Sequence, residues 1–324
     1  PGQDTSPPPG GQIIADHTVV DRYDDIPAEY VAAVKKMWIN IPGESHSSGY
    51  RNGLRFFAEA DSRFSASITD ERPPEPYRED ALRISSFVRN QYSNWSKSAG
   101  EESWYTNPSA LAKIKSHIRY CEKNDLHIAA IGFGWCWDMT WRNPPGGGLD
   151  PVYKVRWAGT SEGGPDGNLI WGLDAEDTAL TGNSVCMDTY LDATQQYMDL
   201  CAAEGYSTKV LFTTGPVDGS PRESGYQRQL KHDHIREYVK ADASRILFDY
   251  ADILAWGDDG TEYTEQWTDG DGDPHSYQMI HPDNALDFGG NKNEDGDHIG
   301  ERGALRLGKA IWWTLARIAG WDGQ

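Results

Sequence analysis

The chain has 324 residues, a formal net charge of -20 at pH 7 and 38% hydrophobic residues. Nucleic acid and anionic membrane surfaces would repel so acidic a chain, so neither is expected as its main partner. The sequence holds no apolar run of the roughly 18 residues that a membrane-spanning helix needs, and no charged-then-apolar leader stands at its start.

The first 12 residues, "PGQDTSPPPGGQ", are rich in Pro, Gly and Ser. Such a composition buries no face, so residues 1–12 are expected to be a linker or tail, as in a mature fragment of a longer protein. Residues 13–324 would then form a single domain. Within it, Asp25 and Pro27 predict the start of a short helix that continues to about Lys36. Residues 37–41 follow as a strand.

Helices and strands then alternate. Residues 107–124 carry apolar side chains at helical spacing and lead into a predicted strand at 127–135. Two further predicted pairs follow, a helix at 188–204 before a strand at 209–214 and a helix at 223–240 before a strand at 245–253. Uninterrupted apolar strands between helices are typical of a parallel sheet covered by helices on both faces.

Two other segments complete the pattern. Residues 138–184 are rich in Gly, Pro, Trp and Asp without a sustained period, which predicts a long loop insertion that shapes specificity. Residues 303–320 predict an amphipathic closing helix. Its expected buried stripe is Ala304, Leu307, Ile311, Leu315 and Ile318, and the side chains expected to point away from that stripe are Arg306, Lys309 and Arg317.

The turn "IPGESHSSGY", residues 41–50, follows the first predicted core strand. Ligands of parallel α/β sheets collect beyond the carboxyl ends of the strands, so Ser45 is well placed to act as a nucleophile. A serine needs a base, usually His, that a carboxylate orients. Among nine His, His298 is the best candidate, because Asp295 precedes it by three residues just before the last helix.

These features together resemble the SGNH (GDSL-type) hydrolase family over about residues 37–320. "GESHS" stands in the place of that family's nucleophile block, and "DGDHIGERGALRLGKAI" looks like its Asp-x-x-His block. The resemblance implies a flavodoxin-like three-layer α/β/α sandwich with a mainly parallel central sheet. It also implies that Ser45 is the nucleophile, His298 the base and Asp295 the orienting acid, with Asp297 as the fallback acid and no cofactor.

The same resemblance implies an oxyanion site made of the nucleophile's own N–H, a Gly N–H and the Asn of a Gly-x-Asn-Asp block. Gly100 in "SAGEES" is the candidate Gly. The predicted strand at 127–135 ends in "GFGWCWD", without an Asn, so Asn183 in "LTGNSVC" is the first candidate for the amide. One such donor is typically worth about 100- to 1,000-fold in rate.

Aromatic residues suggest the substrate. The chain has 13 Trp and 16 Tyr, which either fill the core or present surfaces that stack on sugar rings. Trp135 and Trp137 are candidate substrate contacts. His46 is interpreted either as a substrate contact or as a loop residue, because a chain neighbour of Ser45 points elsewhere. The predicted substrate is a carbohydrate carrying small acyl groups, acetyl first among them.

Acidic clusters raise two alternatives. Asp269, Asp271 and Asp273 alternate as in a calcium loop, but Ile280 stands where an EF-hand requires Glu, so the cluster is either a structural calcium site or a solvated turn. Asp249 and Asp252 could form a carboxylate pair for glycoside cleavage. Residues three apart on a strand point to opposite faces, which argues against that pair.

The expected function is therefore a secreted or extracellular serine esterase, without any predicted oligomeric state. A glycan-binding protein without turnover and a metal-dependent hydrolase remain as alternatives. The four cysteines would form two disulfides in one of three connectivities, or stay as free thiols. They are Cys121, Cys136, Cys186 and Cys201.

Overall fold

The structure is a computed structural model of the whole chain. It describes residues 10–69, 76–89, 94–97, 100–139, 146–159, 170–286 and 298–324. None of the helices in these ranges is long and apolar enough to cross a membrane.

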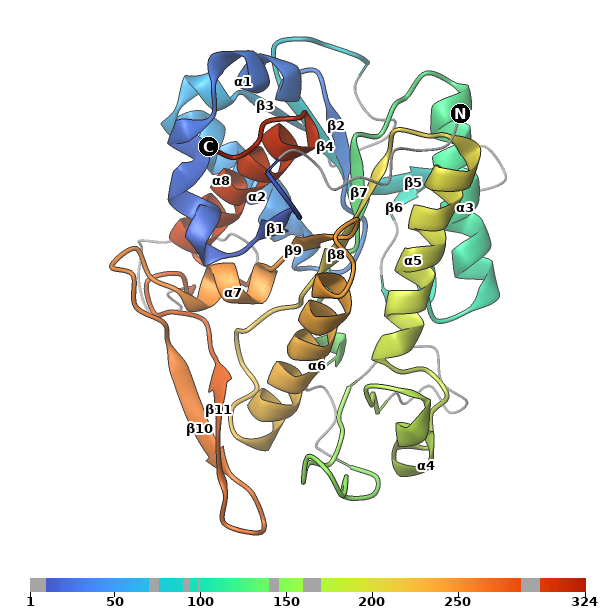
Figure 1. Cartoon of the computed structure of the whole chain (residues 1–324), viewed down its shortest axis with the longest axis vertical. Helices are drawn as coiled ribbons and strands as arrows, with labels where there is room; N and C mark the ends of the chain where they lie inside the picture. The colour runs from blue at the N-terminus through green and yellow to red at the C-terminus, as the bar shows by residue number, and fades with distance from the viewer. Residues whose placement is uncertain are drawn as a thin grey trace.

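A seven-stranded sheet runs through the centre of the molecule, in the order β1-β9-β8-β7-β2-β4-β3 (Figure 1). Each neighbouring pair in it is parallel. The strands are β1 Ile14–Ala15, β2 Trp38–Asn40, β3 Ala66–Thr69, β4 Leu82–Ser85, β7 Ala130–Gly132, β8 Lys209–Thr213 and β9 Ile246–Phe248. Two antiparallel hairpins stand outside the sheet: β5 Phe87–Arg89 with β6 Trp95–Lys97, and β10 Thr264–Thr268 with β11 Pro274–Gln278.

Helices cover both faces of the sheet (Figure 1). One hydrophobic core lies under α1, α2, α7 and α8, and a second lies under α3, α5 and α6. The helices are α1 Ala28–Val34, α2 Ser47–Ala60, α3 Pro108–Lys123, α4 Thr178–Thr181, α5 Met187–Glu204, α6 Glu223–Lys240, α7 Tyr250–Ala255 and α8 Glu301–Ile318. The predicted α/β class with its three layers is confirmed.

Local chemistry explains why the strand predicted at 245–253 is only half right. The backbone leaves the strand after Phe248, and the Asp249 side chain accepts a hydrogen bond from the Asp252 backbone N–H at 3.2 Å. An Asp at this position satisfies an orphan donor of the first helical turn, so a helix begins at Tyr250. The apolar residues that follow pack as helix α7.

Helix α8 is buried far more widely than an amphipathic helix would be, and the prediction that Arg306 and Arg317 point away from the core is wrong. Both side chains are only 4% exposed. Arg306 donates to the Ile253 carbonyl and pairs with Asp258, while Arg317 donates to the carbonyls of Trp321 and Gly11. Each guanidinium finds its partners on segments that fold over the helix.

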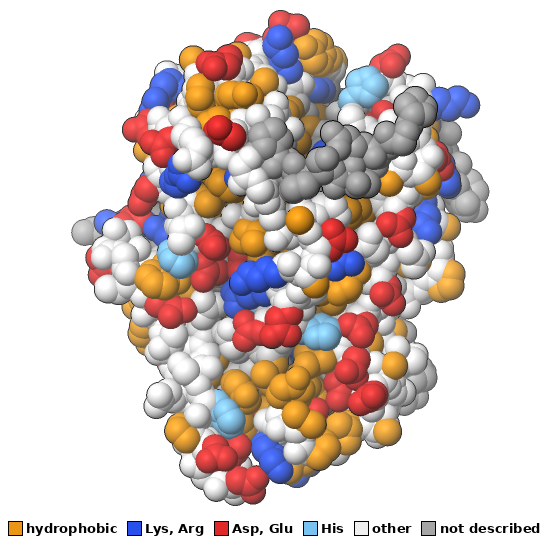
Figure 2. Space-filling model, in the orientation of Figure 1, with side chains coloured by type: hydrophobic (Ala, Val, Ile, Leu, Met, Phe, Trp, Pro, Cys, Tyr) orange, Lys and Arg blue, Asp and Glu red, His pale blue; other side chains and the backbone are white. Residues whose placement is uncertain are grey.

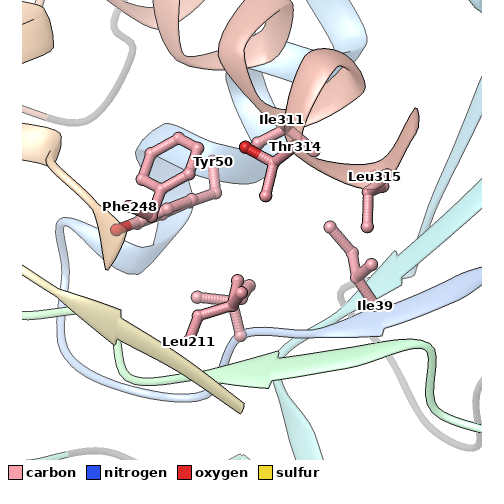
Figure 3. A pocket seen from close by; sticks show the side chains of 8 residues that line it. Ile39, Tyr50, Leu211, Phe248, Ile311, Thr314 and Leu315 are labelled. Atoms are coloured by element: carbon pink, nitrogen blue, oxygen red, sulfur yellow. The ribbon is translucent and has the colours of Figure 1, made fainter. Parts of the chain in front are cut away.

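An apolar pocket lies between the sheet and α8, beneath α2 (Figure 3). Its lining is almost entirely apolar: Ile39, Ile41, Tyr50, Leu211, Phe248, Ile311, Thr314 and Leu315. Such a lining offers no group that could activate a nucleophile, so the pocket is an imperfection in core packing and the chemistry has to be sought at the sheet edge.

Candidate functional site

The turn that carries Ser45 is fixed to the neighbouring strand end. Gly43 and Gly134 form a parallel bridge, and the Glu44 backbone N–H donates to the Gly134 carbonyl at 2.8 Å. Gly43 has φ of 142°, and a Cβ there would lie 2.0 Å from that carbonyl oxygen. Only Gly allows this approach, which holds Ser45 at the carboxyl edge of the sheet, directly before α2.

Ser45 faces a thiol. Its Oγ lies 2.9 Å from the Sγ of Cys136, and the two atoms share a hydrogen bond. Cys136 follows β7, in the stretch "GFGWCWD" where the family resemblance calls for an Asn, and it is 6% exposed. The described structure therefore places a sulfur atom beside the proposed nucleophile.

His46 is buried and paired with an acid. Its Nε2–H donates to Oδ1 of Asp218 at 2.9 Å, and the His46 side chain is 1% exposed. Trp137 donates from Nε1 to Oδ2 of the same carboxylate at 3.0 Å. Burial lowers the pKa of His46, but the charge and hydrogen bond of Asp218 outweigh it and raise the pKa to about 10. In turn, the His46 charge holds the pKa of Asp218 below its usual value despite burial.

His298 reaches the same place from the other end of the chain. Its ring centroid lies 4.8 Å from that of His46 and 4.3 Å from that of Trp137. Its φ is 68°, an uncommon conformation for a residue other than Gly and one that is often found at functional sites. The structure thus brings together Ser45, His46, Trp137 and His298. Asp295 and Asp297 lie outside the described residues, and their role stays a prediction.

Gly100 lies beside the nucleophile turn. Carboxylate oxygens of Glu44, Glu101 and Glu102 lie within 4.8 Å of one another, so the short helix that Gly100 caps is next to Glu44. The role of the Gly100 N–H as an oxyanion donor stays a prediction.

Two other predicted residues are placed differently. The hydrogen bonds of Asn183 stay within its own loop, with Thr181 and with the Val185 backbone. Trp135 is 2% exposed, packs on Phe133 and Tyr190, and donates to the Thr213 carbonyl. Within its loop the Asn183 side chain uses only its oxygen, and its amide nitrogen is buried without a partner among the described residues, so its donor role stays a prediction. Trp135 is a core aromatic with no face for a substrate.

The acidic pattern from Asp269 to Asp273 forms the turn of the β10–β11 hairpin. One oxygen of Asp269 accepts from the backbone N–H groups of Asp271 and Asp273, and the other contacts His275 at 2.9 Å. Asp271 pairs with Lys154 at 3.3 Å. Both oxygens of Asp269 are engaged by nitrogen groups, which favours the turn over a calcium site.

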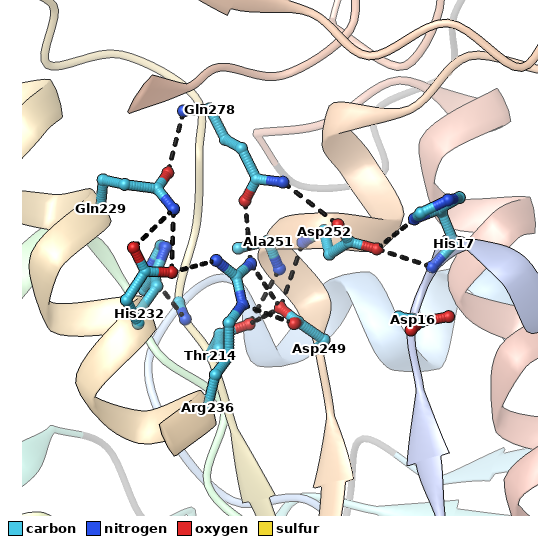
Figure 4. Close-up of polar contacts among 12 residues, drawn as sticks. Asp16, His17, Thr214, Gln229, His232, Arg236, Asp249, Ala251, Asp252 and Gln278 are labelled. Carbon is cyan, nitrogen blue, oxygen red and sulfur yellow. Dashed lines mark hydrogen bonds and ion pairs between the residues drawn. The ribbon is translucent and has the colours of Figure 1, made fainter. Parts of the chain in front are cut away.

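The pair Asp249 and Asp252 is engaged in a polar network (Figure 4). Asp249 binds the Arg236 guanidinium at 2.6 Å and accepts from the Thr214 hydroxyl. Asp252 contacts His17 at 2.5 Å and accepts from the Gln278 amide. With strong donors on both carboxylates, neither fits a free acid or nucleophile for glycoside cleavage.

Within the described residues, two groups of side chains have the spacing to hold a metal ion: Asp16, His17 and Asp252, and Glu44, Glu101 and Glu102. His17 in the first group is already hydrogen-bonded to Asp252 and stacked on Trp256. The second group includes Glu44, the chain neighbour of Ser45, so a metal-dependent mechanism at this site would have to use the second group.

Sequence reasoning missed Cys136 and Asp218 as members of the site. Each follows the carboxyl end of a core strand, Cys136 after β7 and Asp218 after β8. That position in the sequence could have identified them, because such strand ends meet at one edge of a parallel sheet.

Comparison of the chain with protein-family models and with curated proteins found no match.

Proposed function

We propose that the protein is a serine ester hydrolase that removes acyl groups, acetyl first among them, from carbohydrate. The observation that carries the proposal is the meeting of Ser45 and His298, from opposite ends of the chain, around one buried cluster. The ring of His298 packs on His46, the chain neighbour of Ser45. A hydroxyl in the same cluster as two imidazole groups, at the carboxyl edge of a parallel sheet, suits acyl transfer.

In the proposed reaction Ser45 Oγ attacks the ester carbonyl carbon while His298 takes the hydroxyl proton. His298 then returns the proton to the departing alcohol, and the acyl-enzyme is hydrolysed by water along the same path. Asp295 is proposed to orient His298. No metal or other cofactor takes part in these steps.

A flat aromatic surface near the site supports the carbohydrate part of the proposal. Trp267 and His275 are cross-strand neighbours on the β10–β11 hairpin, with centroids 5.7 Å apart and planes 27° apart. Tyr226 of α6 stacks on His275 at 4.3 Å and 16°. All three rings are partly exposed, and adjacent near-coplanar rings suit stacking on sugar rings.

This surface is joined to the site through the loop between β8 and α6. Tyr277 of the hairpin accepts from the Arg222 backbone N–H at 2.6 Å, and Arg228 links Gly219 to the Gln278 carbonyl. Asp218, which pairs with His46, directly precedes Gly219 in the chain. Figure 2 shows apolar side chains gathered on the same part of the molecule, over the lower half of α6 and beside the hairpin.

The test is hydrolysis of p-nitrophenyl acetate and of acetylated xylan by the parent, Ser45→Ala and His298→Ala, each with and without a chelator. Both variants are expected to lose at least about 1,000-fold in kcat, since a nucleophile and its base act as a unit. Ser62→Ala and His127→Ala, at exposed positions, serve as controls.

Trp267→Ala tests the aromatic surface. It should raise KM for the acetylated xylan about tenfold and leave KM for p-nitrophenyl acetate unchanged. Tyr77→Ala, at an exposed position, is the control.

Full activity in Ser45→Ala would exclude the serine mechanism, and activity lost only to the chelator would favour the metal alternative. A polymer that binds without releasing acetate in any variant would favour the glycan-binding alternative.

One observation favours a second candidate, a cysteine-dependent acyl transferase or hydrolase. Cys136 interacts with His46, which is paired with Asp218, and this is the order of groups in a thiol triad. Cys136→Ala separates the two mechanisms. It should abolish activity if the thiol attacks, and it should leave acyl transfer at Ser45 in place if the serine attacks.

A further inference from the structure

The two ring nitrogens of His46 have different surroundings. Nε2 is bonded to Asp218 at 2.9 Å, whereas Nδ1 is buried and has no hydrogen-bond partner among the described residues. A buried nitrogen that stays unsatisfied costs about 1 to 3 kcal/mol in folded proteins, so it calls for an explanation.

His46 is linked to the nucleophile turn through Cys136. Asp218 occupies Nε2, so the Nδ1 side of the ring is the one left for the Cys136 thiol, which interacts with His46 without forming a hydrogen bond of good geometry to Nδ1. The Cys136 sulfur is in turn 2.9 Å from Ser45 Oγ. The Trp137 indole holds the second oxygen of Asp218, so the carboxylate and the ring it bonds are both fixed in orientation.

Charge makes Nδ1 a donor. With its pKa raised to about 10, His46 is an imidazolium at neutral pH and carries a proton on both nitrogens. His46 therefore carries a charged, buried N–H in the cluster that also holds Cys136 and Ser45. Such a group acts most strongly on a charge that develops next to it.

The proposed reaction needs a donor of this kind. Attack by Ser45 leaves a negative charge on the former carbonyl oxygen, while Asn183 lies in the loop of Thr181 and Val185, with which it forms hydrogen bonds. We propose that His46, held by Asp218, is a catalytic residue that donates its Nδ1–H to this oxyanion. The inference rests on the proposed esterase function and assigns the donor that this function requires.

The proposed steps balance in protons and electrons. The Ser45 Oγ to carbon bond forms as the carbonyl electron pair moves onto oxygen, and the Ser45 proton passes to His298. When that pair returns, the bond to the leaving alcohol breaks and His298 supplies the proton. His46 donates a hydrogen bond throughout and transfers no proton.

Several titratable or aromatic groups face His46 from the elements packed around it. Asp218 comes from the loop after β8, Cys136 and Trp137 from the segment after β7, His298 from the turn before α8, and Tyr250 from the start of α7. Arg228 of α6 lies beyond Asp218 and helps to keep that carboxyl ionised.

Two substitutions at His46 separate the roles of its nitrogens. His46→Asn keeps an amide N–H near the position of Nδ1 and gives up the bond to Asp218. His46→Gln reaches toward Asp218 and leaves no donor at the Nδ1 position. The measurements are kcat and KM with p-nitrophenyl acetate and, independently of turnover, the rate at which a fluorophosphonate labels Ser45, followed by mass spectrometry. His127→Gln, at an exposed position, is the control.

His46→Gln is expected to lose about 100- to 1,000-fold in kcat and in labelling rate with little change in KM, and His46→Asn to stay within about tenfold of the parent. Parent-like rates in His46→Gln, or a greater loss in His46→Asn than in His46→Gln, would overturn the proposal. In either case an inactive, unlabelled Ser45→Ala leaves the esterase proposal standing. Full turnover in Ser45→Ala would instead contradict both the esterase proposal and the role of His46.

Asp218→Asn tests the same proposal with His46 intact, should either His46 variant fail to give a cooperative thermal transition. Without the carboxylate, burial lowers the pKa of His46 below 6.5 and the ring is neutral, so Ser45 labelling should already be weak at pH 7 and stay weak to about pH 9, where the parent retains it. A labelling profile like that of the parent would overturn the role of His46.

Discussion

Two residues that define this site, Ser45 and His46, are adjacent in the chain but contact different partners. Ser45 and His46 leave the same turn, yet the first meets Cys136 and the second meets Asp218. A chain neighbour of the nucleophile was expected to point elsewhere, yet His46 and Ser45, with different hydrogen-bond partners, belong to one cluster. What the expectation did not anticipate is that the buried partner of His46 makes its ring part of the same cluster.

The pair of His46 and Asp218 predicts how stability depends on pH. The folded-state pKa of His46 is raised from 6.5 to about 10, so its contribution is complete below pH 6.5 and is lost as the pH rises toward 10. Asp218→Asn should therefore lower the free energy of unfolding by about 3 kcal/mol near pH 6 and by much less near pH 10.

Urea unfolding of both proteins across this range checks the prediction. A difference that stays constant or grows with pH would contradict it. The buried His117 contributes in the opposite direction in both proteins, because burial lowers its pKa to about 3 and stability is lost as the pH falls below 6.5.

Among the elements, α2 and α8 set the distance between the two halves of the site. Helix α2 begins just after Ser45, and α8 begins just after His298. The helices approach through Gly53 and Gly308: a Cβ on Gly308 would lie 2.4 Å from the Gly53 carbonyl oxygen. The contact is backbone against backbone, so no side-chain movement can make room.

Gly308→Val is predicted to lower stability by about 2 to 3 kcal/mol and to reduce ester hydrolysis, because the added side chain separates the helices. Thermal unfolding and p-nitrophenyl acetate hydrolysis measure the two effects. Ala32→Val, at an exposed position of α1, controls for the helix propensity of a β-branched residue. An unchanged melting temperature in Gly308→Val would show that the helices are not in close contact.

For the whole molecule, the sequence left the state of the cysteines open, and the structure has all four as buried free thiols. They lie on different elements: Cys121 on α3, Cys136 after β7, Cys186 before α5 and Cys201 on α5. Burial raises the pKa of Cys121 and Cys186, and raises that of Cys201 to about 12.

A thiol reagent should therefore titrate four thiols in denaturant and react slowly with the native protein, because little thiolate is present and access is poor. Fewer than four in denaturant would indicate a disulfide that the structure does not contain.

Much of the architecture follows from the sequence alone. The helix predicted at 223–240 matches α6 residue for residue, and the alternation of apolar strands with helices predicted the layered parallel sheet. Strands β1, β3 and β4 were not predicted: β1 has two residues, and β3 "ASIT" and β4 "LRIS" mix polar with apolar residues, unlike the apolar stretches that contain β2, β7 and β9. Local patterns determined the elements because propensity and amphipathic spacing act within one segment.

The site depended on tertiary structure. The sequence singled out Ser45 and His298, since a hydroxyl after a strand and an imidazole before a helix are local features. Only folding brought Asp218 to His46 and Cys136 to Ser45, and only folding buried Trp135 and Arg306. These contacts join distant segments, and the charge on His46 comes from a burial and an ion pair that exist once the sheet is assembled.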